Sequence, residues 1–209
     1  MNSFLRRYTD LPYLIDLLMT REISLLSPDS WDDRNDSHYI KQFAKANGLS
    51  SAYALCLAET SETYHHWRLF TNGSNGVCIE FDKAQLISEV SKLNGVEVRA
   101  DTVIYKTIDS LHKVQPSLPE LPFLKRHAFG DEKEFRLFYG SVKKGPPVFR
   151  LPISLKTINR ITFSPWLAEP VFKQVKSNLK SIKGCKSLKI YKSSLVENER
   201  WMRFADNHQ

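Results

Sequence analysis

Short apolar stretches recur along the chain and are separated by polar turns. Brief apolar runs bounded by turn residues are typical of β-strands. They predict strands at residues 4–8, 23–26, 52–57, 77–81, 96–105, 132–139, 148–153, 158–163 and 188–191. Strict alternation of polar and apolar positions is clearest at residues 132–139, which predicts a strand with one face toward the core.

Apolar positions three and four residues apart predict helices between these strands. The helices are expected at residues 11–18, 38–46, 60–70, 86–93 and 166–182. Asp82 is a typical N-cap for the fourth of them. Asp32, Asp33 and Asp36 crowd residues 31–36, which we interpret as a loop of undetermined role. Tyr64, Trp67 and Phe70 share the third helix, where core packing is a commoner use of such aromatic residues than base stacking.

This order of elements predicts an α+β fold with a mixed, mostly antiparallel sheet flanked by helices. A length of 209 residues suits one domain. The prolines of residues 116–122 indicate a loop and no domain boundary, because predicted strands follow them closely. The expected organisation is a single domain over residues 1–209, with a basic helix and strand at about residues 166–193.

The net charge of +7 is concentrated in the C-terminal third of the chain. Residues 1–140 hold 16 basic and 19 acidic side chains, whereas residues 141–209 hold 14 basic and 4 acidic ones. Lys173, Lys176, Lys180 and Lys183 recur at helical spacing and form one stripe. An uncompensated basic stripe predicts an anionic partner, most simply nucleic acid, although an acidic protein and a merely solubilising helix face are alternatives.

The sequence gives no indication of export or of a structural metal. No apolar run is long enough to span a bilayer and no leader is evident, so we expect a cytoplasmic protein without membrane contact. Cys56, Cys78 and Cys185 lack ligand spacing and are expected to be reduced and mostly buried. The adjacent pair His65 and His66 does not form a zinc motif, because neighbouring residues on a helix point in different directions.

The candidate chemistry lies on the strand predicted at residues 132–139. Glu132, Glu134 and Arg136 project from one face of that strand, and Phe135 and Leu137 from the other. Two carboxylates with a guanidinium suit either stabilisation of an oxocarbenium-like ribose or Mg²⁺ binding for phosphodiester cleavage. They are also compatible with an ordinary solvated strand face.

Several short motifs occur in the order of a bacterial family, the domain of unknown function 2971, which the chain resembles. They are Arg7-Tyr8 at the end of the first strand, Trp31 with Asp33 and Asp36, Cys56, Trp67 and Phe70 before Gly76-Val77-Cys78-Ile79 and Phe81, and finally Lys125, Phe129, Glu132, Glu134 and Arg136. The family's Asn and Pro are replaced here by Asp32 and Arg34.

The layout also resembles that of ADP-ribosyltransferases, which implies that NAD is the substrate. The resemblance implies that Glu134 engages the nicotinamide ribose and that Glu132 orients or activates the acceptor. It places the cofactor-binding residues at Arg7, Tyr8, Trp67 and Arg136. The implied reaction transfers ADP-ribose to a nucleic-acid or protein acceptor, including a ribosome-associated target.

The resemblance further implies a toxin or anti-phage effector, with an antitoxin as a possible partner. Two other functions are compatible with the sequence. One is a Mg²⁺-dependent nuclease that uses Asp33 or Asp36 with Glu132 and Glu134. The other is a non-catalytic nucleic-acid-binding module whose function resides in the lysine stripe.

Overall fold

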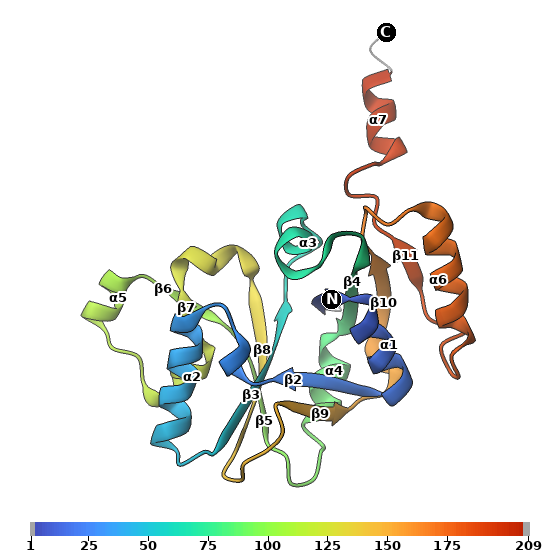
Figure 1. Cartoon of the computed structure of the whole chain (residues 1–209). Helices are drawn as coiled ribbons and strands as arrows, with labels where there is room; N and C mark the ends of the chain where they lie inside the picture. Colours follow the sequence, from blue (N-terminus) through green and yellow to red (C-terminus); the bar gives the residue numbers. More distant parts are fainter. Residues whose placement is uncertain (1–2, 207–209) are drawn as a thin grey trace.

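A computed structural model describes residues 3–206. Within that range, one mixed sheet contains nine strands (Figure 1). Their bounds are β1 Phe4–Asp10, β2 Glu22–Leu26, β3 Ser51–Ala58, β4 Gly76–Asp82, β5 Val98–Thr102, β8 Glu134–Ser141, β9 Val148–Pro152, β10 Ile158–Phe163 and β11 Ile190–Lys192. Two more strands, β6 Ile104–Lys106 and β7 Leu124–Arg126, pair with each other in parallel.

The strand order is β11-β10-β4-β1-β3-β2-β9, and β8 pairs with β3 and β5. All pairs of the large sheet are antiparallel except β10 with β11. The predicted α+β class and mostly antiparallel sheet are therefore confirmed.

The sheet divides at β3. One edge of β3 pairs with β8 along its whole length. On the other edge, β3 meets β1 at the pair Arg6–Ala58 and β2 at the pair Leu26–Ala54. Between these two pairs, residues 55–57 have no strand partner on that side within residues 3–206. The strands β1 and β2 thus diverge from β3 and leave an opening between them.

The helices surround the sheet. Their bounds are α1 Leu11–Thr20, α2 Arg34–Ala46, α3 Tyr64–Phe70, α4 Lys83–Val90, α5 Ile108–Lys113, α6 Glu169–Ser181 and α7 Glu199–Asp206. Short 3₁₀ segments include η3 Leu118–Phe123 and η4 His127–Glu132. In Figure 1, α6 (orange) lies beside β11 at one end of the sheet, α2 (blue) lies near β7 at the other, and α7 (red) extends away from the rest of the molecule. None of the helices within residues 3–206 is long and apolar enough to cross a bilayer.

The main core uses the apolar face of the sheet. Leu5 of β1, Leu55 and Leu57 of β3, and Phe135 and Leu137 of β8 are all buried in it. The predicted inward orientation of Phe135 and Leu137 is therefore confirmed. Because side chains alternate along a strand, Glu134 and Arg136 must project from the opposite face of β8.

The predicted elements differ from the structure mainly at their ends. Residues 34–36 belong to α2 and not to a loop, because the side chain of Asp33 accepts hydrogen bonds from the backbone N–H groups of Asn35 and Asp36 and caps the helix there. The strand predicted at residues 96–105 is interrupted at Val103 and becomes β5 and β6. The predicted helix 166–182 begins only at Glu169.

Candidate active site

A cleft of about 600 Å³ occupies the opening between the diverging strands. Its walls come from β1, β3, α2, α3, β7 and the segment from η4 to β8. The lining side chains include Arg7, Tyr8, Trp31, Asp33, Asp36, Cys56, Leu69, Phe70, Lys125, Phe129, Glu132 and Glu134. Four of the residues expected at the site, Arg7, Tyr8, Glu132 and Glu134, therefore line one cleft.

Strand register explains why these distant segments meet. Arg6 of β1 pairs with Ala58 of β3, and Ala58 pairs with Glu134 of β8. The first strand and the Glu134 strand are thus held in register through a single residue of β3. The small side chain of Ala58 leaves space on this face of the sheet for the larger side chains of its two register partners, Arg6 and Glu134.

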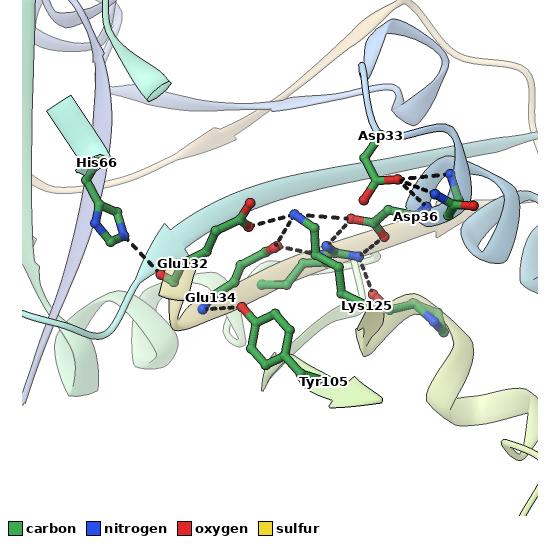
Figure 2. A network of polar contacts seen from close by, with 10 residues as sticks. Asp33, Asp36, His66, Tyr105, Lys125, Glu132 and Glu134 are labelled. Carbon is green, nitrogen blue, oxygen red and sulfur yellow. Dashed lines mark hydrogen bonds and ion pairs between the residues drawn. The ribbon is translucent and has the colours of Figure 1, made fainter. Parts of the chain in front are cut away.

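A buried cluster of charges forms one wall of the cleft (Figure 2). Lys125 Nζ lies 2.6 Å from Glu132 Oε2, 3.5 Å from Glu134 Oε2 and 3.9 Å from Asp36 Oδ2. Arg136 Nε donates to Glu134 Oε1 at 2.7 Å. Three carboxylates therefore face two cations, which leaves the cluster one negative charge.

Arg136 holds this cluster from beneath. Its NH1 and NH2 groups donate to the two carboxylate oxygens of Asp36 at 2.8 and 2.6 Å. NH1 also donates to the carbonyl of Pro122, and the guanidinium lies over the ring of Trp31. Arg136 is fully buried and does not line the cleft. Its contact with a cofactor stays a prediction; in the structure, the carboxylates of Asp36 and Glu134 and the Pro122 carbonyl engage the guanidinium within the wall.

Burial and the neighbouring charges shift the pKa values of the two glutamates in opposite directions. Burial acts to raise the pKa of Glu134, but Arg136 and Lys125 outweigh it and hold that pKa below its usual value. Burial similarly opposes the charge on Lys125, yet Glu134 and Glu132 raise its pKa. Glu132 is more weakly paired, and burial raises its pKa. At neutral pH Glu134 is thus a fixed anion, whereas Glu132 is the carboxylate closer to proton exchange.

Backbone contacts fix the position of both glutamates. The hydroxyl of Tyr105 accepts a hydrogen bond from the backbone N–H of Glu134 at 2.9 Å. His66 Nε2 lies 3.0 Å from the carbonyl oxygen of Glu132 and donates to it, since a carbonyl can only accept. Figure 2 shows His66 and Tyr105 reaching these two residues from different elements.

Arg7 and Tyr8 offer polar groups with little internal pairing. The one hydrogen bond of the Arg7 guanidinium within residues 3–206 goes to the carbonyl of Ser24 at 3.5 Å, and it forms no ion pair there. Burial lowers the pKa of Arg7 to about 10, so it remains charged at neutral pH. The buried hydroxyl of Tyr8 has no hydrogen-bond partner in the described part of the chain. An unpaired cation and an unpaired hydroxyl in one cleft can receive an anionic, hydroxyl-bearing ligand.

Trp67 lies behind the cleft wall. It is fully buried, and its indole Nε1 donates to Glu62 at 2.7 Å. Its ring meets Tyr8 edge-on, with 5.2 Å between the ring centroids. Contact of Trp67 with a cofactor stays a prediction; in the structure Trp67 does not line the cleft and supports Tyr8 from the core side. The alternative interpretation as a core aromatic is correct for this residue.

Cys56 lies on the floor of the cleft and is exposed there, unlike the buried Cys78 and Cys185. Poor solvation and the neighbouring Glu134 raise the pKa of the Cys56 thiol well above its usual value. It is therefore a protonated thiol at neutral pH and a poor nucleophile.

The lysine stripe is not part of this cleft. Lys173, Lys176 and Lys180 belong to α6, and Lys183 follows its end. Lys173 and Lys183 are exposed and the other two are half-buried, with Lys176 Nζ lying over the ring of Phe172. The cleft and the basic surface are thus separate features of the molecule.

Lys125 is a site residue to which the sequence assigned no role, and Asp33 and Asp36 were assigned one only in the nuclease alternative. Asp36 and Arg136 are 100 positions apart, so no local pattern links them. Asp33 uses Oδ1 to cap α2, while its Oδ2 is buried without a partner in the described residues. The sequence did carry one indication of their importance, because Asp33, Asp36 and Lys125 all match motif positions of the family that the chain resembles.

The arrangement of donors does not form a metal site. Within residues 3–206, no group of three His, Cys, Asp or Glu side chains is placed to hold a metal ion. Lys125 and Arg136 already sit among the three clustered carboxylates, where a divalent cation would otherwise have to lie.

Comparisons with known proteins give a family match, structural similarity and one negative result. Residues 66–137 match the model of a family described as protein of unknown function (DUF2971). This segment contains Lys125, Glu132, Glu134 and Arg136, and the predicted resemblance is confirmed over it. A solved structure, Thermus sp. 2.9 DarT in complex with NAD+, matches over 92% of this chain and 96% of that chain, with 10% identity and a TM-score of 0.45. No curated protein matches the sequence.

Proposed function

We propose that this protein is an ADP-ribosyltransferase that moves ADP-ribose from NAD to a nucleic-acid or protein acceptor. The observation that carries the proposal is that Arg7 and Tyr8 of the first strand and Glu132 and Glu134, far away in the sequence, line one cleft in the divided sheet. Family resemblance implied each of these residues separately. Their convergence supports a common role.

Glu134 stabilises positive charge at the ribose. When nicotinamide leaves, the bond between the ring nitrogen and the ribose C1′ breaks, and its electron pair neutralises the pyridinium. Positive charge then develops at C1′ and the ring oxygen. A fixed carboxylate in a poorly solvated cleft stabilises that charge more than it stabilises the ground state. Arg136 and Lys125 keep Glu134 ionised and in place for this role.

Glu132 acts on the acceptor. As the new bond to C1′ forms, the acceptor's proton must leave. Burial raises the pKa of both Glu132 and Asp36, but Asp36 is buried and held by Arg136, so Glu132 is the carboxylate available to take that proton. A base whose pKa approaches the working pH transfers protons most effectively. The side chain of Glu132 is 16% exposed, against 3% for Glu134, so it is the more accessible of the two to an incoming group.

Arg7 and Tyr8 bind the remainder of NAD. The unpaired Arg7 guanidinium suits the diphosphate, with which it forms charge-assisted hydrogen bonds. Tyr8 lines the same cleft beside Arg7 and is the residue that we assign to the ribose. The cleft volume of about 600 Å³ is within the usual range for cofactor sites.

The lysine stripe of α6, formed by Lys173, Lys176, Lys180 and the following Lys183, binds a partner and takes no part in the reaction. An anionic acceptor such as nucleic acid, a ribosome-associated target or an acidic antitoxin would complement it. These partners suit the toxin or anti-phage role that the family resemblance implies.

The test is NAD-dependent labelling. Wild-type protein and Glu134→Gln are incubated with labelled NAD and either RNA, DNA or protein from a lysate. We expect the substitution to abolish labelling, because Gln keeps the shape of the side chain and removes its charge. Glu197→Gln, at an exposed glutamate, is the matched control and should label like wild type.

Thermal unfolding of each variant shows whether loss of labelling reflects loss of fold. Equal labelling by Glu134→Gln and wild type would contradict the transferase. Mg²⁺-dependent shortening of nucleic acid without NAD would instead support the nuclease alternative.

A further inference from the structure

Helix α3 carries a cation and an aromatic residue on its exposed side that the fold does not bury. Tyr64 and Leu69 are 45% and 70% exposed, whereas Trp67 on the same helix is fully buried. The guanidinium of Arg68 lies over the ring of Trp166, 4.2 Å from its centroid, and also contacts the Tyr64 ring. Arg68 Nε donates to the Tyr64 hydroxyl at 3.0 Å.

These contacts hold three flat groups in fixed orientations at the surface. The rings of Tyr64 and Trp166 lie 5.8 Å apart with an interplanar angle of 78°. Tyr64 and Arg68 are exposed and Trp166 is half-buried, so the set remains accessible. We call Tyr64, Arg68 and Trp166 the stacking surface.

The stacking surface lies between the cleft and the basic helix. On the cleft side, Leu69 and Phe70, which follow Arg68 on α3, line the cleft. On the other side, Trp166 belongs to the short connection that leads from β10 into α6. Figure 1 shows α3 at the same end of the molecule as the start of α6.

The charges around the stacking surface favour an anion. Glu169 at the start of α6 lies 4.0 Å from Lys173 and 3.9 Å from Lys192, which neutralise it. Glu62, before α3, is engaged by Trp67 and Ser193 and points into the protein. The basic residues that follow along α6 have no other acidic neighbour in their segment.

We propose that the stacking surface binds the unpaired bases of a single-stranded nucleic acid and guides that strand from the basic helix to the cleft. Exposed aromatic and guanidinium planes stack on bases, and a line of lysines follows the phosphates. A duplex keeps its bases stacked on each other, so it can use the lysines but not the planes. The inference rests on the proposed function, because it names the acceptor of that reaction.

The experiment measures binding without NAD, so its outcome is independent of transferase activity. A fluorescently labelled oligonucleotide of mixed sequence is titrated with the protein as single-stranded DNA, single-stranded RNA and duplex DNA, and anisotropy is recorded. We expect tighter binding of one or both single strands than of the duplex. Trp166→Ala should weaken single-strand binding on the order of ten-fold, the loss typical of one stacking contact.

Two further variants separate stacking from charge and from folding. Arg68→Lys keeps the charge and removes the plane, so it should weaken single-strand binding while leaving duplex binding unchanged. Trp201→Ala, at a tryptophan of α7 that is 79% exposed, is the matched control and should bind like wild type. Arg68 is exposed, so Arg68→Lys tests the proposal even if Trp166→Ala unfolds.

Tighter binding of single-stranded DNA or of single-stranded RNA would identify which of the two nucleic acids the stacking surface binds, and either result supports the proposal. Equal affinity for duplex and single strands would overturn it, as would unchanged single-strand binding by a folded Trp166→Ala together with Arg68→Lys. Absence of binding to all three probes would also overturn it, and the basic surface would then suit an acidic protein. Failure of the transferase alone would appear as intact binding without NAD-dependent labelling.

Discussion

At the scale of single residues, Arg7 is placed at a cost to stability. Arg7 is half-buried, and its guanidinium has no ion pair within the described residues. Burial lowers its pKa from 12.5 to about 10, so the charged form is disfavoured by folding at every pH below that value. The penalty is therefore fully present at neutral pH and is relieved only above pH 10. Such a group is retained when a ligand uses it.

The first prediction is that Arg7→Met stabilises the protein and abolishes its response to NAD. Removing an uncompensated, half-buried charge should raise the free energy of unfolding by about 1–3 kcal/mol. Thermal unfolding with and without NAD measures both effects. Arg203→Met, at an exposed arginine, should change neither. A destabilised Arg7→Met that is still stabilised by NAD would contradict the role given to Arg7.

The second prediction concerns Lys125 and the pH dependence of activity. It is the cation that Glu132 and Glu134 share. In Lys125→Met the carboxylates lose this partner, so their pKa values rise and more of each is protonated at a given pH. We expect the acid limb of the activity profile to move to higher pH, so that activity falls more at pH 6 than at pH 8.

The control is Lys125→Arg, which keeps the charge and should restore most of the profile. Both variants are assayed at a temperature where unfolding curves show them to be folded, because removing one partner of a buried ion pair costs about 3–5 kcal/mol. An equal loss of activity at all pH values would show that Lys125 only supports the fold.

At the scale of elements, the start of α2 connects the fold to the site. Asp33 caps this helix through Oδ1, and the first turn presents Asp36 to Arg136. Arg136 in turn holds Glu134. A change at the cap is thus transmitted to the carboxylate that we propose acts at the ribose.

The third prediction compares two substitutions at this cap. Asp33→Ala should lower the free energy of unfolding by about 1 kcal/mol, the usual cost of losing an N-cap, and reduce labelling. Asp33→Asn should retain the cap and the stability. Oδ2 of Asp33 is buried without a partner in the described residues, so replacing it by an amide group breaks no hydrogen bond of the fold, and a loss of labelling by a stable Asp33→Asn would assign that oxygen to the substrate. Chemical denaturation and the labelling assay separate the two effects, and equal stability of Asp33→Ala and wild type would contradict the capping role.

The same element shows how far the sequence could be interpreted. Periodicity located most strands and helices, because alternation and helical spacing are local properties. The three aspartates concealed the start of α2, because a run of acidic side chains looks like a loop until one of them is seen to cap a helix. The resemblance assigned Arg136 and Trp67 to the cofactor, and neither the resemblance nor sequence spacing shows how deeply a side chain is buried; both are fully buried in the structure. Pairing of Arg136 with Asp36, 100 residues away, is a tertiary fact that no local pattern contains.

At the scale of the whole molecule, the divided sheet accounts for the cleft. The strand β3 is fully paired on one edge and released on the other between Ala54 and Ala58. Segments that are far apart in the sequence, from Arg7 to Glu134, line this opening, so the order of motifs along the chain could not reveal it. The charge distribution, in contrast, was visible in the sequence, because it depends on composition alone.

The last prediction follows from the separation of the cleft from the basic surface. Binding to an exposed lysine stripe depends on counterion release and falls steeply with salt, whereas the cleft is buried and weakly screened. We expect the KM for a nucleic-acid acceptor to rise steeply with salt and the KM for NAD to change little. Lys173→Glu with Lys183→Glu should raise the acceptor KM and flatten its salt dependence while leaving NAD hydrolysis in the absence of acceptor unchanged. Lys143→Glu with Lys144→Glu makes the same change in net charge at exposed residues outside α6, so an equal effect of the two pairs would show that overall charge and not the α6 surface recruits the acceptor.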